Sequence, residues 1–156
     1  MEKKLKSLAF HTLVPIMLSF IIWMLIPDYT AFYEGLRKPV LRLPQGAFVF
    51  IWCFIYLLMG IAAHLVEMTK TDDIEKQKAF SLYYLQLLVN LLWMPMFFGF
   101  KNLFVAALWT VLLLIMVILN LRKFTMIKRS AGYLFVVYLL WVLFLTYYVI
   151  AIDVMN

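Results

Sequence analysis

The sequence predicts an all-α polytopic membrane protein, a bundle of five transmembrane helices forming a single domain over residues 1–156. Hydrophobic residues make up 67% of the chain and charged residues 14%, and the mean hydropathy is +0.97, values unlike those of a soluble domain. Five stretches of 20 to 24 residues contain no charged residue. Because a helix rises about 1.5 Å per residue, about 20 residues cross the roughly 30 Å hydrocarbon core of a bilayer. The stretches lack the alternation of barrel strands, so helices are the structure that can satisfy their backbone in lipid.

The first predicted span covers residues 7–27 and follows a basic start. A signal peptide also begins this way, but the apolar run is long and no small-x-small cleavage site lies near its end, so we expect a retained span. Pro15 lies inside it, which a helix bundle tolerates. The longest segment outside the predicted membrane, residues 28–43, follows this span.

Four further spans follow. The second begins at Pro44, a residue suited to a first helical turn. The third and fourth are separated only by Lys101 and Asn102, so they must be antiparallel neighbours. The predicted bounds of these four spans are 44–66, 79–100, 103–121 and 130–152.

The distribution of basic residues predicts the orientation. With five spans, the segments on the amino-terminal side hold ten basic residues, and those on the opposite side hold four. The positive-inside rule then places the N-terminus in the cytoplasm and the C-terminus outside, most simply in a bacterial plasma membrane. This topology and anionic lipid account for the net charge of +6, and no nucleic-acid partner is indicated. The ten residues are Lys3, Lys4, Lys6, Lys70, Lys76, Lys78, Arg122, Lys123, Lys128 and Arg129.

Several classes of chemistry are disfavoured. No charged residue lies within a predicted span, and ion pumps usually need such residues near mid-membrane. His11 and His64 fall near span ends, where we expect surface groups and not a proton relay. No metal-binding spacing is present, so no metal site is expected. Cys53 lies inside the second span, where we expect a buried, unreactive thiol.

Aromatic and amide side chains recur at helical spacing on three of the spans, which places each set on one helix face. Such stripes are also typical of bundle cores and interfacial belts. The functional interpretation is one shared cavity for a large, flat, mostly apolar molecule. The residues are Phe48, Trp52, Tyr56 and Met59 on the second span, Gln86, Asn90, Trp93 and Phe97 on the third, and Tyr138, Trp141, Leu145 and Tyr148 on the fifth.

The segment 28–43 is expected to lie over one mouth of that cavity. Pro39 and Pro44 restrict it and favour a lid. Arg37, Lys38 and Arg42 lie on the translocated side, against the general charge bias. They are interpreted either as partners of carboxylates on a flat ligand or as contacts to anionic lipid headgroups.

These residues resemble motifs of the translocator protein/tryptophan-rich sensory protein family. One motif runs Tyr33-Glu34-Gly35-Leu36-Arg37-Lys38-Pro39 and continues through Pro44 and Phe48 to Trp52, Tyr56, Met59 and Gly60. A second is Gln86…Asn90-x-x-Trp93-x-Pro95-x-Phe97-Phe98-Gly99, and a third is Tyr138-Leu139-x-Trp141-x-x-Phe144. The motifs cover over half of the chain in the family's order, and the five spans and long first loop agree with them.

The resemblance implies a five-helix bundle, often a homodimer, that binds tetrapyrroles such as protoporphyrin IX or haem as ligands and requires no cofactor. Sterols and synthetic aromatic compounds are further ligands in the family. Carried over by position, the binding residues would be Tyr33, Pro39, Trp52, Tyr56, Asn90, Trp93, Tyr138, Trp141 and Leu145.

Three functions remain open at this point. The first is a sensor or carrier that binds a porphyrin or haem. The second is an enzyme that degrades porphyrin in light, a reaction credited to some bacterial relatives, in which Trp52 and Trp141 would be the catalytic residues. The third is a lipid- or sterol-binding scaffold in a stress response.

Overall fold

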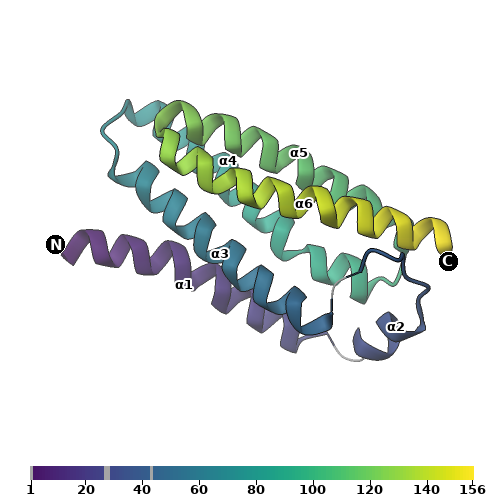
Figure 1. Cartoon of the computed structure of the whole chain (residues 1–156). Helices are drawn as coiled ribbons and strands as arrows, with labels where there is room; N and C mark the ends of the chain where they lie inside the picture. The colour runs from purple at the N-terminus through teal and green to yellow at the C-terminus, as the bar shows by residue number, and fades with distance from the viewer. Residues whose placement is uncertain (1, 27–28, 43) are drawn as a thin grey trace.

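The computed structural model describes residues 2–26, 29–42 and 44–156. Within them the chain forms helices and no strand (Figure 1). The elements are α1 (Glu2–Met24), α2 (Tyr29–Gly35), α3 (Gln45–Met68), α4 (Asp73–Leu91), the π-helical turn η1 (Pro95–Gly99), α5 (Leu103–Ile127) and α6 (Arg129–Met155).

The prediction of an all-α protein with five spans is confirmed. Five helical segments are long and apolar enough to cross a membrane, and the protein is an integral membrane protein. Most helices extend past the expected bounds; α1 begins at Glu2 and α5 continues to Ile127. A helix needs only its internal hydrogen bonds, so it continues beyond the apolar run. Residue 27, the expected end of the first span, lies outside the described residues.

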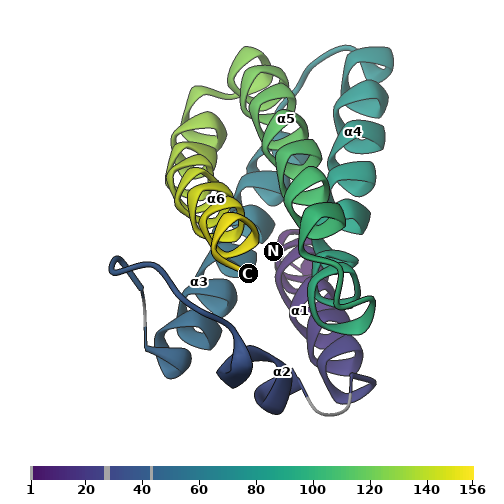
Figure 2. The ribbon, with the colours of Figure 1, turned by 90° about the vertical axis from the view of Figure 1, so that its right-hand side faces the viewer.

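The long helices form an incomplete ring. Viewed from the end where the C-terminus and α2 lie, α1 adjoins α3, α3 adjoins α6, α6 adjoins α5, and α5 adjoins α4 (Figure 2). Contact between α1 and α4 is sparse, as is contact between α3 and α4. The ring is therefore loosest where α1, α3 and α4 meet. The short helix α2, which was expected to be loop, lies at this end of the bundle (Figures 1 and 2).

Small residues let α1 and α3 approach closely in the half of the bundle away from α2. A Cβ at Gly60 would lie 2.5 Å from the backbone carbonyl oxygen of His11. Ala63, one turn further along α3, is fully buried. Because transmembrane helices associate mainly through close packing, this contact attaches α1 to the bundle.

A cluster of polar side chains joins the same two helices near the N-terminus. His11 Nε2 and Ser7 Oγ both bond to the Glu67 carboxylate, and Ser7 Oγ lies 2.8 Å from His64 Nδ1. His11 is only 5% exposed and its ring stacks on Phe80. The expectation that His11 is a surface group is wrong: its ring is buried, and the partly exposed Glu67 carboxylate of the neighbouring helix bonds to it.

The end of the third span differs from a simple helix. Pro95 has no N–H, so the regular i−4 hydrogen bond is lost there. The chain re-forms as η1, in which Phe100 N donates to Pro95 O at 3.0 Å with a five-residue spacing. Lys101 then adopts a left-handed conformation, with φ of 53°, and the Asn102 side chain caps α5 by accepting from Val105 N. This tight reversal confirms that the third and fourth spans are antiparallel neighbours.

Candidate functional site

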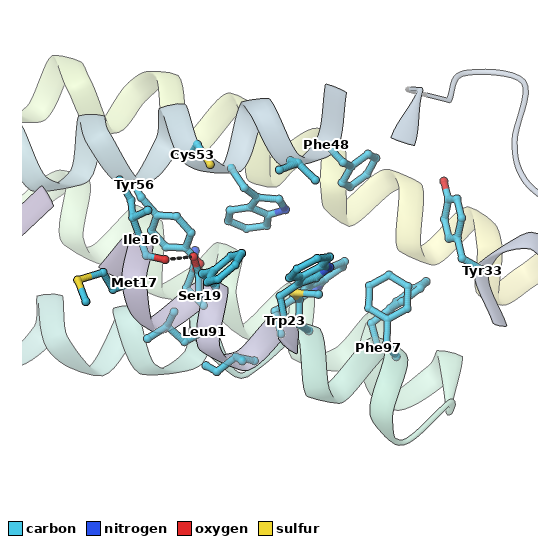
Figure 3. A pocket seen from close by; sticks show the side chains of 18 of the residues that line it. Ile16, Met17, Ser19, Trp23, Tyr33, Phe48, Cys53, Tyr56, Leu91 and Phe97 are labelled. Atoms are coloured by element: carbon cyan, nitrogen blue, oxygen red, sulfur yellow. Dashed lines mark hydrogen bonds between the residues drawn. The ribbon is translucent and has the colours of Figure 1, made fainter. Parts of the chain in front are cut away.

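A cavity of about 470 Å³ lies between α1, α3 and the α4–η1 segment (Figure 3). Its size is typical of a site for a small organic ligand. The wall is almost entirely apolar. Its residues are Ile16, Met17, Ser19, Phe20, Ile22 and Trp23 from α1, Tyr33 from α2, Phe48, Val49, Trp52, Cys53 and Tyr56 from α3, Asn90, Leu91, Trp93, Met94, Phe97 and Phe98 from the third span, and Tyr148 and Val149 from α6.

Aromatic rings from facing helices form the core of the wall. The Trp52 ring stacks on Tyr56 with centroids 5.8 Å apart and lies 6.1 Å from the Trp93 ring. Trp93 in turn stacks on Phe97 at 5.3 Å and 15°. A spacing of four residues places Trp52 and Tyr56 on one face of α3, and Trp93 and Phe97 on one face of the third span. The contact between Trp52 and Trp93 joins the two pairs. The result is a continuous aromatic surface suited to a flat ring system.

A buried hydrogen-bond network supports this wall. Tyr56 donates its hydroxyl hydrogen to Asn90 Oδ1 at 2.7 Å, and the Asn90 amide donates to the Tyr138 hydroxyl. Gln86 Nε2 donates to the same Tyr138 oxygen at 2.8 Å. The network therefore links α3, α4 and α6 and holds the Tyr56 ring against Trp52. The mid-span amides of Gln86 and Asn90 thus bond to neighbouring helices through these atoms.

The two inner tryptophans differ in the state of their indole N–H groups. Trp93 is 4% exposed and donates to Thr110 Oγ at 2.8 Å, which fixes its ring against α5. Trp141 is 7% exposed, and among the described residues its Nε1 has no hydrogen-bond partner. The Trp141 ring meets Trp52 edge-on at 5.8 Å and 89°. It therefore lies directly behind the cavity wall with an unused donor.

The helix α2 closes one end of the cavity. The Tyr33 hydroxyl bonds to the Tyr148 hydroxyl at 2.6 Å, and Phe32 contacts Phe97. A second attachment joins the main chain of Arg37 to the side chain of Asn156: Arg37 N donates to Oδ1 at 2.9 Å, and Nδ2 donates to Arg37 O at 3.0 Å. Side chains from the far end of α6 thus hold the lid in place.

The three basic residues of the lid do not line the cavity. The Lys38 ammonium donates to the Leu36 carbonyl at 3.1 Å and lies 4.6 Å from the centre of the Tyr33 ring. The Lys38 ammonium therefore makes its contacts within the lid segment. The side chains of Arg37 and Arg42 are exposed. Pairing of these three residues with a ligand carboxylate or with lipid headgroups stays a prediction.

The cavity is open on the side of α1 and α3. Phe20 and Val49 line it and are also 57% and 61% exposed. Cys53 lines the cavity as well and is exposed. The expectation of a buried Cys53 is therefore wrong; the residue lies on the face of α3 that α1 leaves uncovered. Because these helices cross the membrane, the opening faces lipid.

The structure divides the residues expected to bind ligand into two groups. Seven line the cavity: Tyr33, Phe48, Trp52, Tyr56, Asn90, Trp93 and Phe97. Five lie outside its wall: Gln86, Tyr138, Trp141 and Leu145 are buried against other helices, and Pro39 is buried in the lid segment. The entire α1 contribution was missed, together with Val49, Cys53, Leu91, Met94, Phe98 and Val149. An apolar residue facing a cavity and one facing lipid have the same hydropathy, so no sequence pattern marked them.

Comparison with known proteins is consistent with this arrangement. The model of the TspO/MBR family matches residues 11–155, nearly the whole chain. The chain belongs to the TspO/MBR family. It is thus an integral membrane protein of that family, and its cavity is built from two of the motifs that suggested the resemblance.

Relatives within the TspO/MBR family occur in several bacteria. The tryptophan-rich sensory protein of Cereibacter sphaeroides is 33% identical over 118 residues, which cover 76% of this chain and 71% of that protein. The tryptophan-rich protein TspO of Chlorobaculum tepidum is 32% identical over 74% of this chain and 73% of its own length. Protein CrtK of Rhodobacter capsulatus is 32% identical over 72% of this chain and 70% of its own length.

Proposed function

We propose that this TspO/MBR-family protein binds a tetrapyrrole, a porphyrin or haem, in the cavity between α1, α3 and α4 and acts as a sensor or carrier. The observation that carries the proposal is the aromatic surface formed by Trp52, Tyr56, Trp93 and Phe97. Rings of this kind bind flat apolar molecules through offset stacking and edge contacts. The apolar wall and the cavity volume support a ligand of the same character.

The lid and the lipid-facing opening support the role of a binding protein. A ligand dissolved in the bilayer would reach the cavity between α1 and α3, while α2 covers the end of the bundle. Residue Ser19 and the Asn90 amide are among the few polar groups on the wall. Such a site would retain a poorly soluble pigment without modifying it.

Fluorescence titration of the purified protein with protoporphyrin IX tests the proposal. Binding should quench tryptophan emission saturably. Trp52→Phe and Trp93→Phe should each weaken affinity several-fold, because each shortens the aromatic surface. Trp109→Phe is the matched control: its Nε1 donates to the Val89 carbonyl at 2.8 Å and its ring does not line the cavity. Equal affinities in all four proteins would contradict the proposed site.

A second candidate function is light-dependent degradation of the bound porphyrin. The edge-on contact between Trp52 and Trp141 supports it. The photoexcited porphyrin would take an electron from Trp52, Trp141 would return one to Trp52, and dioxygen would be the terminal oxidant of the pigment. Illumination of the complex should then generate a new absorbing product, which Trp52→Phe and Trp141→Phe would each suppress even at saturating pigment. A product yield no higher than that of free pigment would reject this activity and leave the binding function intact.

A further inference from the structure

A second cavity adjoins the first at the α2 end of the bundle. It measures about 460 Å³ and lies between the segment that ends α1 and the η1 turn. Ile22 and Phe98 line both cavities, so the two cavities share part of their wall. The remaining wall of the second cavity is apolar apart from Lys101. Lys101 therefore lines a cavity that adjoins the main one.

Lys101 differs from the basic residues of the lid. It is exposed and lines the second cavity, whereas Arg37, Lys38 and Arg42 line neither of the two cavities. Within the described parts of the chain, no carboxylate lies within 4.0 Å of its ammonium. The ammonium lies 5.9 Å from the centre of the Phe32 ring, and Phe32 contacts Phe97 on the main cavity. The ammonium therefore lies near α2, the lid helix to which Phe32 belongs.

The backbone at Lys101 supports a role for the side chain. A φ of 53° is costly for a residue with a Cβ, and glycine or asparagine is the usual choice at such a turn. Helix α5 begins two residues later, so its positive end adds to the potential near Lys101. This positive potential favours an anion beside Lys101 on the cavity wall.

We infer that Lys101 and the second cavity form a subsite for the acid group of the ligand whose flat body occupies the main cavity. The inference rests on the proposed function and narrows its substrate class to amphiphilic ring compounds that carry a carboxylate at the edge. It also assigns the acid-binding role to Lys101 and not to the basic residues of the lid.

The test compares two probes with the same ring, protoporphyrin IX, which carries two carboxylates, and its dimethyl ester, which carries none. Affinities are measured in a neutral detergent, so that anionic lipid is absent. Lys101→Asn should weaken binding of the diacid about three- to tenfold and leave binding of the diester unchanged, because a charge-assisted hydrogen bond is lost. Lys101→Arg should retain the preference for the diacid, and so should the control variant Lys38→Gln.

The Lys101→Asn variant is expected to fold, because asparagine tolerates the left-handed conformation. Its thermal midpoint should equal or exceed that of the wild type. An unchanged diacid-to-diester ratio in Lys101→Asn would overturn the inference while leaving the proposed function intact. A variant that keeps this ratio but retains less phosphatidylglycerol than the wild type in nanodiscs would assign Lys101 to lipid headgroups instead. Failure of both probes to bind the wild type would remove the proposed function and this subsite with it.

Discussion

The hydroxyl groups of Tyr33 and Tyr148 lie 2.6 Å apart and share a hydrogen bond that joins the α2 lid to α6 at the end of the main cavity. Both rings line that cavity. The bond therefore couples the position of the lid to the wall on which a ligand would rest.

Tyr33→Phe should accelerate ligand release. A neutral hydrogen bond contributes about 0.5–1.5 kcal/mol, so its loss should raise the dissociation rate roughly two- to tenfold. Stopped-flow measurement of protoporphyrin release would show this change. Tyr147→Phe is the matched control, since Tyr147 is exposed on the same helix and does not line the cavity. Identical release rates in the wild type and Tyr33→Phe would mean that this bond does not hold the lid.

Asn90→Leu should destabilise the bundle. The substitution leaves the Tyr56 hydroxyl without its acceptor and removes one donor to Tyr138. Buried hydrogen bonds between transmembrane helices contribute on the order of 1 kcal/mol, so we expect a loss of about 1–2 kcal/mol in unfolding free energy. The measurement is denaturant unfolding in detergent. A double-mutant cycle with Tyr56→Phe should show coupling, and strictly additive effects would contradict the network.

Gly60→Ala should loosen the attachment of α1. The new methyl group would lie 2.5 Å from the His11 carbonyl oxygen, which is backbone and cannot rotate away. Such overpacking typically costs about 1–3 kcal/mol. Gly46→Ala in the same helix is the control, because nothing lies within 4 Å of its added Cβ, and it should be neutral or slightly stabilising. Equal thermal midpoints for the two variants would disprove the close contact.

Cys53 should react with a lipid-soluble maleimide, and a bound ligand should protect it. The chain has a single cysteine, so labelling reports on this position alone. The thiol is exposed and also lines the main cavity. We expect saturating protoporphyrin to slow labelling several-fold and prior labelling to weaken protoporphyrin binding.

A relocated cysteine provides the control for that experiment. Leu57 lies one turn further along α3, is 42% exposed and does not line the cavity. In the Cys53→Ala/Leu57→Cys variant, labelling should be insensitive to the ligand. If protoporphyrin slowed labelling equally at both positions, the effect would come from pigment dissolved in the detergent micelle.

The spans and the aromatic stripes could be predicted because both are local properties. The thickness of a bilayer requires a continuous apolar run, and Phe48, Trp52 and Tyr56 share a face at helical spacing whatever surrounds the helix. The partners in the buried hydrogen-bond network could not be predicted in the same way. Tyr138 and Trp141 share a helical stripe, but the rotation of α6 against α3 and α5 places both behind the cavity wall, with Tyr138 holding Asn90 in position.

Residue order alone was enough to establish the membrane class, the helical architecture and the family, because each follows from short-range pattern and motif. Only the packed structure decided which apolar faces enclose space. Both the cavity-facing and the lipid-facing surfaces of α1 are apolar, so composition cannot separate a cavity-facing Ile16 from a lipid-facing neighbour. The left-handed turn at Lys101 and the loose junction of α1, α3 and α4 likewise arise from how helices meet, and these contacts determine where a ligand and its charge would lie.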